Sequence, residues 1–180
     1  MRVTVEQITE AFRQNLEAFR RILHTTEPGR LTFKKDDSWW SVLEVVHHVA
    51  RVNTSAAGSL GQLVEGFRAE PAGDAAEGVE IQDALENIDD SWVLSNLQAP
   101  PGSEPEGELS APQAERLLEA SHAGIKTLLE LGQKVDLRGV TTPSKLFGTL
   151  NFYERVYFLA RHEKTHLYQI KLKLAETVRS

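Results

Sequence analysis

Residues 151–175 read NFYERVYFLARHEKTHLYQIKLKLA, and this stretch decides the fold. Its apolar side chains recur at steps of three and four residues, which places them on one face of an α-helix. They are Phe152, Val156, Leu159, Leu167, Ile170 and Leu174. Asn151 and Glu154 have the spacing of a capping box, in which each side chain satisfies a free amide at the start of a helix. The stretch therefore predicts a long helix, from near Asn151 to about Ala175, that buries one face against other helices.

Three further stretches have the same periodicity and predict three more long helices. They cover residues 5–25, 42 to about 67, and 111 to about 132. Ser41 and Glu44 form a capping box in front of the second stretch, which fixes where that helix begins. Because each helix has one apolar stripe, the four are expected to pack together as a bundle.

The connecting segments are rich in glycine and proline, which predicts loops over residues 28–37 and 98–108 and a mobile surface loop over 69–78. A shorter amphipathic helix is suggested by Ile81, Leu85, Ile88 and Trp92. No stretch alternates long enough to predict a strand. The expected fold is an all-α four-helix bundle with one extra short helix and a long loop between its second and third long helices, formed as a single domain over residues 1–180.

Composition excludes several classes of function. The net charge is −6 and no cluster of Lys and Arg occurs, which argues against a nucleic-acid or anionic-membrane partner. No apolar run approaches the ~18–20 residues of a membrane span, and the N-terminus lacks the apolar core of a secretory signal. The absence of cysteine excludes disulfides, thiolate ligands and a cysteine nucleophile. We therefore expect a cytoplasmic protein.

Three of the six histidines are placed where they could share one metal ion. His162 and His166 lie four residues apart, so both imidazoles are on one flank of the last helix's apolar stripe. On the second long helix, His48 lies at the edge of the apolar stripe, while His47 is predicted to point away from it. Two imidazoles from one helix and one from a facing helix predict a three-histidine metal site with room for water, the open arrangement of catalytic metals.

A competing hypothesis comes from the same residues. His162 to His166 spells H-E-x-x-H, the pattern of zinc metalloproteases, in which the glutamate activates zinc-bound water. Those enzymes take a third ligand further along the chain, but only fourteen residues follow His166, with Glu176 as their single carboxylate. The missing sheet pattern also argues against a peptidase.

Four other side chains carry weaker expectations. Glu163 falls within the apolar stripe, so it either pairs with an arginine in the bundle, which we favour, or acts near the metal as a base. Gln169 is on the same flank as His166 and could orient a bound water. His24 and His122 have no other potential metal ligand placed beside them in this way, and they are expected to be surface or helix-end residues.

Residues 40–50, WSVLEVVHHVA, resemble the W-[ST]-x-x-E-x-x-x-H-L motif of the DinB-like (YfiT-like) metalloprotein superfamily of damage-inducible helical bundles. Residues 147–154, FGTLNFYE, resemble the closing half of that pattern, which leads to H-x-x-x-H-x-x-Q at 162–169. Residues 97–101 and 108–112 also look like those of family members. The resemblance runs from about Trp40 to Ile170.

The resemblance implies a metal site and a range of functions. The family's three ligand histidines map onto His48, His162 and His166, the same three that the helical periodicity selects. Similar proteins include metal-dependent hydrolases and S-transferases that use low-molecular-weight thiols, and family members are often homodimers. The expected function is thus a metal-dependent transferase or hydrolase of a small molecule, with a non-catalytic metal- or ligand-binding stress-response protein as the alternative. Zinc or nickel is expected foremost, since imidazoles suit both, as they do iron and copper. Neither a catalytic residue nor a substrate can be assigned from the sequence.

Overall fold

A computed structural model describes residues 1–36, 39–68, 70–88, 92, 99 and 102–176, and the structure below is that of these residues. The long helices are α1 (Val5–Thr25), α3 (Val42–Glu65), α5 (Ala111–Gly132) and α6 (Phe152–Glu176). The short helical elements are α2 (Pro28–Thr32), the 3-10 helix η1 (Gly73–Glu77) and α4 (Asp83–Glu86). The strands are β1 (Arg2–Val3), β2 (Val79–Glu80), β3 (Thr141–Ser144) and β4 (Gly148–Asn151). The predicted all-α four-helix bundle is confirmed.

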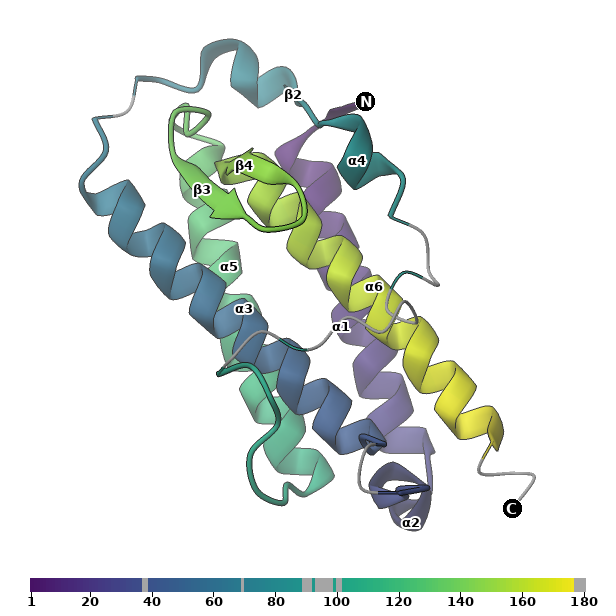
Figure 1. Ribbon diagram of the computed structural model, residues 1–180. Helices are drawn as coiled ribbons and strands as arrows, with labels where there is room; N and C mark the ends of the chain where they lie inside the picture. Colours follow the sequence, from purple (N-terminus) through teal and green to yellow (C-terminus); the bar gives the residue numbers. More distant parts are fainter. Residues whose placement is uncertain (37–38, 69, 89–91, 93–98, 100–101, 177–180) are drawn as a thin grey trace.

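The four long helices surround one elongated core (Figure 1). Helix α5 packs against α1 and α3, and α6 packs against the same two helices from the other side. The order around the bundle is therefore α1–α5–α3–α6. This order makes α3 and α6 neighbours, so side chains on their facing flanks can meet.

The helix starts follow the sequence closely. Ser41 and Glu44 form the predicted box, in which the backbone NH of Ser41 donates to the Glu44 carboxylate over 2.7 Å. Asn151 and Glu154 do the same at α6, with the Asn151 NH donating to Glu154 over 2.9 Å. Because these caps depend only on residues three apart, they could be predicted from the sequence alone.

Several connecting segments differ from the expectation. Residues 28–32, predicted as loop, form α2, which begins with Pro28 in its first turn. The segment 69–78, predicted as a mobile surface loop, contains η1, and Ala75 is fully buried. The expected amphipathic helix around Ile81–Trp92 is reduced to the four residues of α4, and residues 89–91 lie outside the described part.

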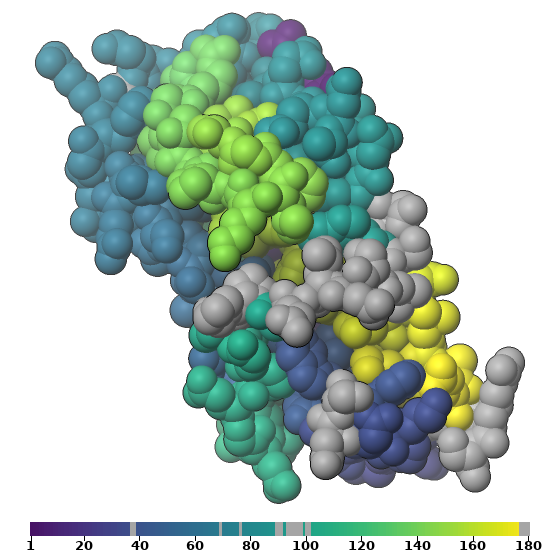
Figure 2. All heavy atoms as spheres, in the orientation of Figure 1, coloured from purple at the N-terminus to yellow at the C-terminus, as the bar shows by residue number. Residues whose placement is uncertain are grey.

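The sequence predicts no strand, and the structure adds two short pairs of strands to the helical bundle. Residues 141–144 and 148–151 pair as an antiparallel hairpin, in which Thr142 lies opposite Leu150. Gly148 has a φ of 73°, which suits glycine at the turn. Figure 2 shows this hairpin on the surface between α3 and the segment that contains α4. Strands of four residues are too short for alternation to reveal them, and their partners decide whether they form.

The apolar core is divided by a polar layer. One half of the core includes Phe12, Leu60, Ile125 and Val156, and the other includes Phe19, Val46, Leu118 and Ile170. Between the two halves, each long helix contributes one buried polar side chain: Asn15, Asn53, His122 and Glu163. The predicted metal ligands of α6 lie on either side of Glu163, so the site is placed at this layer.

Candidate metal centre

Three buried imidazoles meet between α3 and α6. His48, His162 and His166 each present one ring nitrogen, and these nitrogens lie within 4.8 Å of one another. The Nε2 atoms of His162 and His166 are 3.0 Å apart. The ring of His48 lies 4.9 Å from that of His166, measured between centroids. The structure thus brings together the three histidines that the sequence selected.

Hydrogen bonds fix which nitrogen of two rings faces the centre. The Nδ1 of His48 lies 2.7 Å from the carbonyl oxygen of Ser103, and the Nδ1 of His166 lies 2.8 Å from Oε1 of Gln169. A carbonyl oxygen can only accept, so both Nδ1 atoms carry the proton and both Nε2 atoms keep a lone pair. Gln169 therefore orients a histidine, where the sequence had suggested that it orients a water.

Burial keeps these imidazoles neutral. It lowers the pKa of His166 to about 3, with a further contribution from the charge of His48. Burial is also the main reason why the pKa of His162 lies well below its ordinary value, and why that of His48 is lowered. Neutral imidazole is the form that binds metals, so the rings are ready to act as ligands at neutral pH.

A segment before α5 holds His48 in place. Arg51, one turn after His47, donates to the carbonyl of Gly102 over 2.8 Å and pairs with Glu106 over the same distance. Ser103, whose carbonyl accepts from His48, is buried between these two contacts. On the other side, the ring of Trp40 lies 5.1 Å from that of His48. Sequence reasoning missed Arg51 and Ser103, because backbone acceptors from a distant loop leave no pattern.

The carboxylate of Glu163 makes its contacts with other residues than the three imidazoles. It is fully buried, accepts hydrogen bonds from Asn53 over 2.6 Å and Asn15 over 3.0 Å, and lies 2.8 Å from Nε2 of His122. The structural pairing that we favoured is present, but the expected arginine partner was wrong: His122 and two amides take its place. A carboxylate held from three other helices has no free oxygen to aim at a metal-bound water, which weakens the metalloprotease hypothesis.

Two of the other histidines also differ from the expectation. His122, predicted at the surface, is buried, with its ring edge-on to Phe12 at 5.4 Å. It lies three residues before Ile125 and four after Leu118, a spacing that could have revealed it. His47, predicted to point outward, is buried, and it borders a pocket that residues 107–109 also line. His24 is exposed as expected and pairs with Glu115.

The donor set fits one divalent transition metal. Three neutral imidazoles converge, and two of them have the second nitrogen hydrogen-bonded to an oxygen, as metal-bound histidines usually do. Within the described chain, no fourth His, Asp or Glu joins the group. A set of three protein ligands is the arrangement that leaves a coordination position for substrate.

The fold and this site define a helical-bundle protein with a candidate three-histidine metal centre. The model of the DinB superfamily matches residues 11–170, and the chain belongs to that superfamily. No curated protein and no solved structure matches the chain. None of the described helices combines the length and the apolar character that crossing a membrane requires.

Proposed function

We propose that His48, His162 and His166 hold one divalent metal and that the protein uses it to transfer a thiol to a small molecule, with hydrolysis as the second reaction. The observation that carries the proposal is the convergence of three buried, neutral imidazoles without a fourth protein ligand among the described residues. Structural sites are closed by four protein ligands, whereas catalytic sites keep a position open. Zinc and nickel are the metals to test first.

When bound, the metal supplies Lewis acidity, which lowers the pKa of a thiol or water nucleophile. The chain's own groups orient and shield the site. Ser103 and Gln169 hold two imidazoles through Nδ1. The ring of Phe158, 5.9 Å from that of His162 between centroids, contributes an apolar wall.

The surroundings favour a thiol over water as the nucleophile. No carboxylate in the described chain joins the three histidines as a ligand, and Glu163 is held by Asn53. Glu104, whose charge reaches His48, accepts a hydrogen bond from the backbone NH of Gly102. A free thiol has a pKa of about 8.5, so it ionises near neutral pH with little help. Water has a pKa of about 15.7 and needs a much larger shift. Because the chain has no cysteine, the thiol comes from a co-substrate.

A non-catalytic role is the alternative, and one observation favours it. The three imidazoles are 3%, 8% and 4% exposed for His48, His162 and His166, and they adjoin the polar layer that divides the core. A metal there could serve to join α3 to α6, or to capture a ligand, without any reaction. In that case metal removal would lower the melting temperature while no substrate would be turned over.

The first experiment is elemental analysis of untagged protein purified without chelator. We expect about one equivalent of a transition metal per chain, lost in His48→Ala and in His162→Ala. His47→Ala, at the adjacent buried position, and His24→Ala, at the surface, are matched controls that should keep the metal. Equal loss in His47→Ala and His48→Ala would contradict the assignment of His48.

Activity is then tested on the metal-loaded protein with low-molecular-weight thiols and electrophilic small molecules. S-transfer that disappears in His162→Ala, while circular dichroism shows an intact fold, supports the enzyme. Unchanged turnover by the metal-free protein contradicts it. Homodimerisation, for which the family resemblance is the support, is a further proposal, and light scattering tests it.

A further inference from the structure

Arg155 is a partly buried cation that has no carboxylate partner among the described residues. Among the residues that the structure describes, no carboxylate or carbonyl binds its guanidinium, and its nearest recorded contact is the ring of Phe158, 5.8 Å from Cζ to the centroid. Other arginines of the chain do pair with carboxylates: Arg13, Arg20, Arg51 and Arg138. A partly desolvated charge without a bound anion is unfavourable, so the placement of Arg155 has to be explained.

Two features of Arg155 add to this cost. Burial lowers its pKa below the ordinary value, although a guanidinium stays protonated under all physiological conditions. Arg155 also lies in the first turn of α6, where the partial positive charge of a helix N-terminus disfavours a cation. Both effects would be relieved by an anion bound at the guanidinium.

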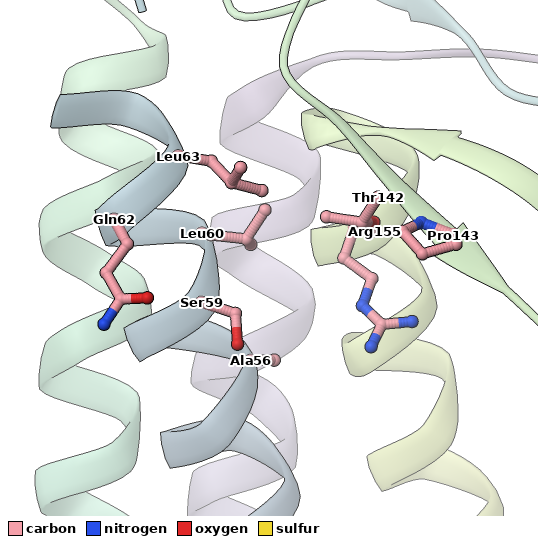
Figure 3. Close-up of a pocket in the computed structure, with 8 residues that line it drawn as sticks. All are labelled: Ala56, Ser59, Leu60, Gln62, Leu63, Thr142, Pro143 and Arg155. Atoms are coloured by element: carbon pink, nitrogen blue, oxygen red, sulfur yellow. The ribbon is translucent and has the colours of Figure 1, made fainter. Parts of the chain in front are cut away.

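The guanidinium borders a pocket of about 400 Å³ between α3 and α6, next to β3. Figure 3 shows the guanidinium in front of α6, at about the height of Ser59 of α3. Leu60, Leu63 and Pro143 give the pocket apolar walls, and Arg155 is the one charged group among its lining residues. Such a pocket suits a small molecule with an apolar body and one negative charge.

None of the three histidines lines the pocket, but the charge of Arg155 reaches His162 and adds to the effect of burial in lowering the pKa of that imidazole. Arg155 precedes His162 by seven residues, which is two helical turns and ~10 Å along the same face of α6. Phe158 bridges the interval, with its ring 5.9 Å from that of His162 between centroids. A molecule held at Arg155 is therefore about two helical turns away from the imidazoles.

We propose that Arg155 binds the carboxylate of the small-molecule substrate and so sets the substrate class as carboxylic acids. The location of the reacting end rests on the proposed function, whereas the carboxylate site does not. A single guanidinium fork matches one carboxylate in both charge and geometry. A phosphate, with a charge of about −1.5 to −2, would need a second cation that the lining does not provide.

The carboxylate site is tested on metal-free protein, independently of any reaction. Hexanoate and its uncharged analogue hexanamide are titrated while backbone amide resonances are followed by NMR. We expect saturable shifts at Leu63 and Thr142 with hexanoate, and affinity at least ~10-fold weaker for hexanamide, as loss of a charge-assisted hydrogen bond predicts. Arg155→Gln and Arg155→Met should remove this preference, while Arg116→Gln, on the exposed face of α5, should keep it. Equal binding of the two probes, or full hexanoate affinity in both Arg155 variants, would overturn the proposal.

A second measurement tests the link to the histidines. Zinc-loaded protein is titrated calorimetrically with 6-mercaptohexanoate and 6-mercaptohexanol. We expect the carboxylate to improve affinity at least ~10-fold in the wild type and not in Arg155→Gln. If the protein takes up no zinc, the proposed function fails, and the hexanoate titration still decides the carboxylate site. If zinc binds but the two thiols bind equally, Arg155 does not select the substrate, and that part of the proposal is wrong.

Discussion

Replacing Glu163 with alanine tests whether this buried carboxylate stabilises the bundle through the polar layer or instead takes part in the reaction. In the structure Glu163 accepts from Asn15 and Asn53 and lies beside His122, so it connects α6 to the three other long helices. Glu163→Ala would leave two amides and one imidazole without their shared partner in the core. A buried polar group that loses its partner costs about 1–3 kcal/mol, and three such groups meet at Glu163.

We therefore expect Glu163→Ala to lower the free energy of unfolding by about 3–5 kcal/mol. For a chain of this length, 1 kcal/mol corresponds to about 2–4 °C, so the melting temperature should fall by roughly 6–20 °C. Glu163→Gln should lose less, since its oxygen can still accept from one amide. The measurement is urea unfolding of metal-free protein, followed by circular dichroism.

The matched control is Glu10→Ala, which removes a glutamate from an exposed ion pair with Arg13 and should leave the free energy of unfolding nearly unchanged. If Glu163→Ala were as stable as Glu10→Ala, the layer would not stabilise the bundle. Metal content and activity distinguish this structural role of Glu163 from a role as catalytic base. Glu163→Gln should retain its metal and any S-transfer activity, whereas a peptidase base would lose activity on this change.

Three other predictions follow from the site. Metal at 100 times its dissociation constant should stabilise the protein by about 2.7 kcal/mol, seen as a rise of roughly 5–10 °C in a thermal melt, and His162→Ala should abolish the rise. Gln169→Ala should weaken metal affinity about 10–100-fold in a competition assay, because Nδ1 of His166 loses its acceptor, and Gln169→Glu should restore most of it. Metal-free protein should lose stability as the pH falls from about 6.5 towards about 3, because His166, with its pKa lowered to about 3, stays neutral in the folded state while the unfolded chain takes up a proton. The slope should reach about 1.4 kcal/mol per pH unit for each such histidine in urea titrations, and a stability that rises on acidification would contradict the neutral, buried imidazoles.

Much of the site could be predicted because its ligands follow local rules. His162 and His166 share a helical face whatever the rest of the chain does, and His48 lies at the edge of an apolar stripe that had to face the core. The surroundings of Glu163 and His122 could be predicted only in part. The helical period buries Glu163, but which residue of another helix meets it depends on the rotation and offset of all four helices.

The sequence by itself determined the four long helices, their capped starts and the three histidines, since periodicity and capping act over three or four residues. The tertiary structure alone decided the β3–β4 hairpin, the burial of His47 and the carbonyl of Ser103 that orients His48. It also placed Arg155 beside a pocket, where no carboxylate of the described residues pairs with it. These features join residues far apart in the chain, and their energies come from packing and desolvation that exist only once the helices have assembled.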